Sequence, residues 1–232
     1  MTPLSKNARA AGLLYILSSL FGVVRLIYIP NALIVQGNAS ATANNIASHE
    51  SLFRFGIVSY LICGTLWIFV ALALYQLLKR VDRTLAVLMV IGSLVVAPIF
   101  IVNAANDAAA LLFARGADFL SVFDKAQREA FVMLFLNLHH QLDLANYLGS
   151  AWWFFPFGLL VFRSTFLPRI LGAWLMLACF AYLAVSLSGL LYPAYADKVW
   201  TFAQPVLFAE VATMLWLAVI GVTEKSLAPR NS

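Results

Sequence analysis

The stretch ALALYQLLKRVDRTLAVL, Ala71–Leu88, consists of two apolar runs separated by a short basic joint. The run before the joint extends back to Phe53, and the run after it continues to Ala114. Each run exceeds the roughly 20 residues that an α-helix needs to cross the core of a bilayer. Because a helix satisfies its own backbone hydrogen bonds in lipid, the stretch predicts a turn between two membrane-spanning helices.

The composition of the whole chain agrees with a membrane location. Of its 232 residues, 63% are hydrophobic and only 11% are charged, and the mean hydropathy is +0.90. Soluble domains have about 25% charged residues, so this chain cannot cover a water-exposed surface. The net charge of +5 does not indicate nucleic-acid binding, because the basic residues stand at the ends of apolar runs. The two cysteines, Cys63 and Cys179, form neither a disulfide framework nor a zinc-binding spacing.

The same apolar pattern recurs along the chain and predicts an all-α fold, a polytopic bundle of six transmembrane helices. We expect a single transmembrane domain over residues 1–232, with spans at approximately 10–35, 53–78, 84–114, 129–162, 170–191 and 199–222. Two outer connections are expected to contain short helices at the membrane interface. The first would begin with Ser40 or Thr42 as its N-cap, and the second carries a capping box formed by Asp124 and Gln127.

The distribution of basic residues predicts that both termini are cytoplasmic. In that orientation the outer loops contain four basic residues: Arg115, Lys125, Arg128 and Lys198. The inner side contains nine: Lys6, Arg9, Lys79, Arg80, Arg83, Arg163, Arg169, Lys225 and Arg230. An excess of lysine and arginine is typical of cytoplasmic loops, so the chain is oriented by the positive-inside rule.

Polar residues inside the third and fourth spans provide the main functional signal. At about 100° per residue, Asp143 falls beside His139 on one narrow stripe of the fourth span, and Asp107 lies on a similar stripe of the third. A rise of about 1.5 Å per residue places both stripes near the outer end of the bilayer core. We therefore expect His139 and Asp143 to face Asn103 and Asp107, while His140 lies to the side. The predicted ligand-binding residues are Asn103, Asn106, Asp107, His139, Asp143, Asn146 and Ser150.

A second polar pair is predicted from depth alone. By the same rise, Arg25 lies about 24 Å above the inner basic residue Arg9, and Glu210 lies at a similar depth in the last span. Opposite charges at matched depth predict an intramembrane ion pair between the first and last helices, with either a structural or a ligand-binding role.

Five stretches of the chain resemble one bacterial family of multi-pass membrane proteins, catalogued as domain of unknown function 4386. They are LIVQGNASATANNIASHESLFRFG, ALALYQLLKRVDRTLAVL, VFRSTFLPRILGAWL, LYPAY and PVLFAEVATMLWLAVIGV. The resemblance extends from Arg9 to about Val222. His139 stands where the fourth helix of the family tends to have a histidine, whereas the following HQLDLAN departs from the family pattern. The resemblance implies a protein of the bacterial inner membrane, and it implies no activity.

The residues leave three functions open. The preferred one is binding of a small molecule or lipid in an outer-facing polar pocket between the third and fourth helices, with transport as an extension. The second is an intramembrane metal-dependent hydrolase, for which His139, Asp143 and Asp107 form a weak candidate metal site. The third is a non-catalytic accessory subunit. Membrane lipids are the expected partners; neither a cofactor nor nucleic-acid binding is expected, and no oligomeric state is indicated.

Overall fold

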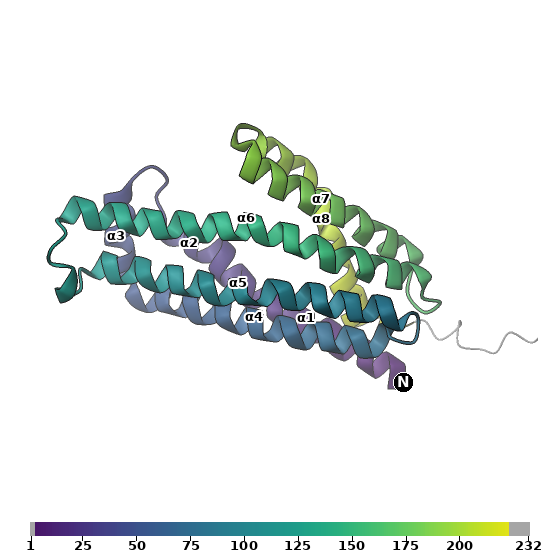
Figure 1. Ribbon diagram of the computed structural model, residues 1–232. Coiled ribbons are helices and arrows are strands. Elements are labelled where there is room, and N and C mark those ends of the chain that lie inside the picture. Colours follow the sequence, from purple (N-terminus) through teal and green to yellow (C-terminus); the bar gives the residue numbers. More distant parts are fainter. Residues whose placement is uncertain (1–2, 223–232) are drawn as a thin grey trace, which may run out of the picture. The chain divides into compact units, whose positions relative to one another are not determined.

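The computed structural model describes residues 3–222, and this part of the chain contains helices and no strand (Figure 1). Lys225 and Arg230, two of the predicted inner basic residues, lie outside the described residues. In chain order the elements are α1 (Pro3–Val23), the π-helical turn η1 (Val24–Tyr28), α2 (Ile29–Leu33), α3 (Ala39–Ser48), α4 (Glu50–Leu78), α5 (Arg83–Arg115), the 3₁₀ turn η2 (Asp118–Leu120), α6 (Lys125–Arg163), α7 (Arg169–Leu191) and α8 (Pro193–Val219).

Six helices in the described part are long and apolar enough to cross a membrane. The first, Pro3–Leu33, combines α1, η1 and α2, and the other five are α4, α5, α6, α7 and α8. Their outer surfaces carry many exposed apolar side chains, for example Val95, Ile101 and Phe202. Such surfaces are unstable in water and suit contact with lipid. The chain is therefore an all-α, multi-pass membrane protein, as predicted.

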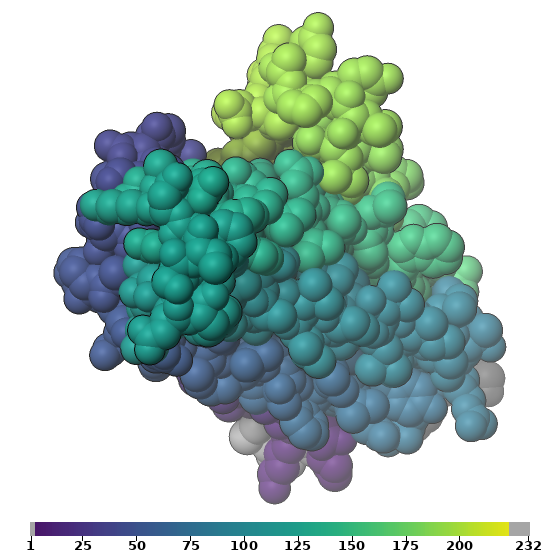
Figure 2. Space-filling model, turned by 60° about the vertical axis from the view of Figure 1, so that its left-hand side comes forward, coloured from purple at the N-terminus to yellow at the C-terminus, as the bar shows by residue number. Residues whose placement is uncertain are grey.

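The connection before α4 contains the short helix α3, whose N-cap differs from the prediction. The side chain of Asn38, rather than Ser40 or Thr42, accepts a hydrogen bond from the Ala41 backbone at 2.9 Å. The Thr42 hydroxyl instead bonds the backbone of Val35, which fastens α3 to the end of the first span. Ser40 donates to Glu129 of α6 at 3.0 Å, and Figure 2 shows α3 beside the α5–α6 connection.

The connection between α5 and α6 lacks a separate α-helix. Its only helical element among the described residues is the 3₁₀ turn Asp118–Leu120, and the predicted capping box begins α6 itself. The box is present: the Asp124 side chain accepts from the Gln127 backbone at 2.8 Å, and the Gln127 side chain accepts from the Asp124 backbone at 3.0 Å. Since these bonds satisfy the first backbone N–H groups of a long helix, no break follows the box.

The described residues form two compact units. The first unit comprises residues 3–17, 66–97 and 144–222, and the second comprises residues 18–65 and 98–143. The core of the first unit is mostly aliphatic and includes the large aromatic side chains of Tyr15, Trp153, Phe154 and Phe157, which are almost completely buried. In this unit α7 and α8 lie side by side as an antiparallel hairpin (Figure 1).

Close helix contacts in the first unit depend on glycine. A Cβ atom on Gly172 of α7 would lie 2.4 Å from the backbone nitrogen of Phe162 and 2.7 Å from the carbonyl oxygen of Gly158, both on α6. A Cβ on Gly12 of α1 would lie 2.3 Å from the backbone nitrogen of Ala218 on α8. Small residues allow helix backbones to approach this closely in membranes.

Candidate functional site

The second unit contains a buried cluster of charged and polar side chains. Its members come from four different spans: Arg25 from η1, Tyr60 from α4, Asn103 and Asp107 from α5, and His139 with Asp143 from α6. Asn103 and Asp107 are fully buried, His139 is 3% exposed and Arg25 is 3% exposed. Placing charged groups inside a transmembrane bundle has a high free-energy cost, so a cluster of this kind is a candidate functional site.

A π-helical turn positions Arg25. Pro30 has no backbone N–H, and its ring clashes with the carbonyl group one turn earlier in a regular α-helix. The chain relieves this clash by widening the preceding turn, in which the backbone of Ile29 donates to the carbonyl oxygen of Val24. Ile29 is consequently buried and Tyr28 is exposed, and Arg25 points inward. Single π-helical turns of this kind are frequent at functional sites.

The carboxylate of Asp107 holds the guanidinium group of Arg25 through two bonds. Nε of Arg25 donates to Oδ2 at 2.6 Å, and Nη2 donates to Oδ1 at 2.5 Å. The two side chains are 4% and 0% exposed. This two-pronged geometry is the strongest form of an arginine–carboxylate pair and fixes the orientation of both groups.

His139 lies between two carboxylates. Its Nδ1 atom is 3.1 Å from Oδ1 of Asp107 and 3.2 Å from Nη2 of Arg25. Its Nε2 atom is 3.3 Å from Oδ2 of Asp143, within ion-pair distance but without hydrogen-bond geometry to any described residue. The ring also packs against Tyr60 with a centroid distance of 5.2 Å. The predicted approach of His139 to Asp107, across two helices, is confirmed.

Asp143 is held by two donors from other helices. Its Oδ1 atom accepts a hydrogen bond from the Tyr60 hydroxyl and another from Nδ2 of Asn103, both at 2.8 Å. The predicted contact between the stripes of the third and fourth spans is therefore present. The contribution of Tyr60 was not predicted, although a tyrosine within an apolar span is itself a signal of a buried hydroxyl that needs a partner.

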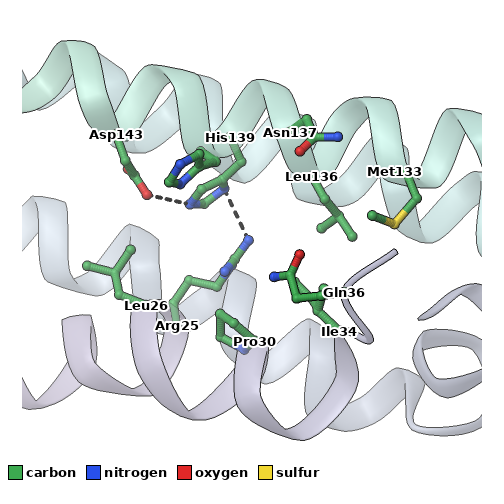
Figure 3. A pocket seen from close by; sticks show the side chains of 11 residues that line it. Arg25, Leu26, Pro30, Ile34, Gln36, Met133, Leu136, Asn137, His139 and Asp143 are labelled. Carbon is green, nitrogen blue, oxygen red and sulfur yellow. Dashed lines mark hydrogen bonds and ion pairs between the residues drawn. The ribbon is translucent and has the colours of Figure 1, made fainter. Parts of the chain in front are cut away.

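A cavity of about 300 Å³ opens beside this cluster (Figure 3). Its polar lining consists of Arg25, Gln36, Asn137, His139, His140 and Asp143. Its apolar lining consists of Leu26, Pro30, Ile34, Met133 and Leu136. The cavity thus lies between the first and fourth spans, rather than between the third and fourth as predicted. The third span does not line the cavity, but it supplies Asp107 as the partner of Arg25 and Asn103 as a partner of Asp143.

Three other predicted ligand-binding residues do not line the cavity. Asn106 is half-buried on α5 and does not line the cavity. Asn146 and Ser150 belong to the part of α6 in the first unit, where the Ser150 hydroxyl donates to the Asn146 backbone at 3.0 Å. Helical phase placed Asn146 and Ser150 on the stripe of His139, but that stripe extends over about three turns, which is longer than a single site.

The predicted ion pair between Arg25 and Glu210 is wrong, because each residue has other partners in its own unit. Arg25 is held by Asp107. The two carboxylate oxygens of Glu210 accept hydrogen bonds from the hydroxyls of Tyr15 at 2.6 Å and Tyr182 at 2.9 Å. Matched depth does not specify the direction in which a side chain points around its helix.

The candidate metal ligands surround a guanidinium group. Both oxygens of Asp107 contact Arg25, so the positive charge of the arginine stands where a metal ion would need those oxygens. Within residues 3–222 no group of three or more histidine, cysteine, aspartate or glutamate side chains is arranged to hold a metal ion. The arrangement favours hydrogen bonding and proton binding over metal ligation.

Comparison with known proteins identifies one family. Residues 10–221 match the family model described as Domain of unknown function (DUF4386), and the chain belongs to this family. No curated protein and no solved structure matches the chain.

Proposed function

We propose that this member of the DUF4386 family binds a small molecule or a lipid headgroup in the cavity beside Arg25, His139 and Asp143. The supporting observation is the cavity itself, whose volume of about 300 Å³ is at the lower end of the range for ligand sites. Buried charged groups line it together with apolar side chains, a combination that fixes the orientation of a ligand while burying its apolar part.

A purely structural role explains less of the geometry. Polar residues often hold transmembrane helices together, and Tyr60, Asn103 and Asp107 have bonds of this type. Structural bonding does not require Asp143 and His139 to reach a cavity that also contains Gln36 and Asn137. The hydrolase is not favoured, because the arginine occupies the oxygens of its candidate metal ligand. No observation favours an accessory subunit.

A tryptophan at the cavity wall tests ligand binding. Leu26 lines the cavity and is 45% exposed, so a tryptophan can be accommodated there without repacking the core. We expect Leu26→Trp to lower the amount of co-purifying ligand at least about tenfold, as the indole fills volume that the ligand needs. Native mass spectrometry of the purified protein measures the bound mass.

The neighbouring Ile27 provides the matched control. It is 55% exposed and does not line the cavity, so Ile27→Trp should retain the ligand of the wild type. Equal ligand retention in both variants, or a wild-type protein with no bound mass and no affinity for any probe, would contradict the proposal.

We also propose that the protein resides in the bacterial cytoplasmic membrane with both termini in the cytoplasm. The support is the excess of basic residues at the joints Lys79–Arg83 and Arg163–Arg169. A reporter enzyme that is active only outside the cytoplasm should be active when fused after Asn38 or Lys125. It should be inactive when fused after Arg80 or Ser164. Activity at the two latter positions would reverse the proposed orientation.

A further inference from the structure

The formal charges of the groups that face His139 do not sum to zero. These groups are Arg25 from η1, Asp107 from α5 and Asp143 from α6, with the ionisable hydroxyl of Tyr60 approaching from α4. His140, the next residue of α6, is exposed. Arg25 and Asp107 compensate each other. The negative charge of Asp143 remains, unless a positive charge joins it.

The surroundings of Asp143 are rich in hydrogen-bond donors. Two donors, the Tyr60 hydroxyl and the Asn103 amide, point at Oδ1, and an imidazole nitrogen approaches Oδ2. A carboxylate can accept all of these contacts at once. An unbalanced charge inside a membrane protein has a high free energy, so one positive charge would stabilise this cluster.

A proton on His139 can provide that charge. Both ring nitrogens stand beside a carboxylate oxygen, Nδ1 at 3.1 Å from Asp107 and Nε2 at 3.3 Å from Asp143. Only an imidazolium ion carries an N–H group on both ring nitrogens, because neutral imidazole has one donor and one lone pair. In the neutral ring, a lone pair on Nε2 would face Asp143, whereas a lone pair on Nδ1 would lie beside Asp107 and accept from Nη2 of Arg25 at 3.2 Å.

A cationic ligand can replace this proton from the cavity. Both His139 and Asp143 line the cavity (Figure 3). An ammonium group beside Asp143 would donate N–H groups to Oδ2 and to Nε2, which becomes an acceptor once the ring is neutral. The ammonium then compensates Asp143, and the proton on His139 is no longer needed. A bound ammonium and a proton on His139 therefore exclude each other electrostatically.

We infer that the cavity binds a primary ammonium group on a short apolar stem, in exchange for one proton released from His139. The inference rests on the proposed function of this cavity and names its ligand class. In the exchange, one protonated protein and one ammonium ion give one ammonium-bound protein and one free proton, so the charge of the site is unchanged. Leu26, Met133 and Leu136 can cover an alkyl stem. A soluble amine and the ethanolamine headgroup of a lipid share this chemistry.

Calorimetry with n-butylammonium chloride tests the exchange. The full-length protein is held in phosphatidylcholine nanodiscs, and titrations are made in two buffers with different ionisation enthalpies, at about pH 5.5 and about pH 7.5. Over the range in which His139 is protonated, the affinity should rise by up to about tenfold per pH unit, with up to about one proton released per bound ammonium. His139→Gln should bind without proton release and with no pH dependence.

The two other histidines provide the controls. His49→Gln, at an exposed position outside the cavity, should behave as the wild type. Loss of proton release in His140→Gln but not in His139→Gln would overturn the assignment. Failure of butylammonium to bind at either pH, or binding that releases no proton in the wild type, would also overturn it. Binding of butyrate instead would refute the ligand class while leaving the cavity as a binding site.

A lipid arm identifies the source of the ammonium. If the ligand is a lipid, phosphatidylethanolamine in the nanodisc should compete with butylammonium for the cavity. The apparent affinity for butylammonium should then be at least about tenfold weaker than in phosphatidylcholine nanodiscs, because the phosphatidylcholine headgroup has no N–H group. Unchanged affinity identifies a soluble amine as the ligand. Both results are consistent with proton exchange at His139. They distinguish a lipid headgroup from a soluble amine as the source of the ammonium group.

Discussion

Asp107→Ala is expected to lower the free energy of unfolding by about 3–5 kcal/mol, the cost of leaving one partner of a buried ion pair uncompensated. Asp107 makes two bonds to Arg25 and stands 3.1 Å from His139, so its removal strands a guanidinium group that is 3% exposed. Reversible unfolding in mixed micelles, followed by circular dichroism, measures the change.

A double variant separates the ion pair from the packing around it. Arg25→Met combined with Asp107→Leu contains no charge to strand, so it should recover most of the loss. Asp118→Ala, which removes an exposed acid from the α5–α6 connection, should change stability by less than about 0.5 kcal/mol. If the double variant is no more stable than Asp107→Ala, the pair does not account for the cost.

Gly172→Ala is expected to destabilise the first unit by about 2 kcal/mol, within the usual range for overpacked cores. The added methyl group would lie 2.4 Å from the backbone nitrogen of Phe162, and backbone atoms cannot move aside as a flexible side chain can. The loss should appear although alanine favours the helix over glycine. Thermal unfolding in detergent, followed by the loss of monodisperse protein, compares the variants.

Gly22→Ala is the matched control for this substitution. Its Cβ would meet only the Sγ atom of Cys63, at 3.3 Å, so packing and helix propensity should nearly offset each other within about 1 kcal/mol. Equal stability of the two alanine variants would show that the α6–α7 contact tolerates a wider spacing.

The six spans were predictable because hydropathy reports a physical requirement that acts on every residue of a span. A helix in lipid needs about 20 apolar residues whatever its neighbours are. The contact of His139 with Asp107 was predictable for a related reason. Helical phase and rise are fixed by the backbone, and one short connection joins α5 to α6, so the two stripes had to be adjacent.

The partner of Arg25 was not predictable from the same quantities. Counting depth from Arg9 places Arg25 along the helix axis, because α1 is regular up to Val23. Depth leaves open which neighbouring span a side chain faces. Tyr60 and the cavity depend on how four helices meet, and no local pattern in the sequence encodes that arrangement.

The separation of Arg25 from Asp107 has a consequence for biosynthesis. The two residues are 82 positions apart in the chain, and ribosomes add roughly 5–20 residues per second. Asp107 is therefore synthesised roughly 4–16 s after Arg25. An unpaired arginine opposes insertion of its span by about 2.5–3.5 kcal/mol at the bilayer centre, and by less toward the outer end, where Arg25 lies. The guanidinium group of the first helix is therefore compensated only after the third helix has been made.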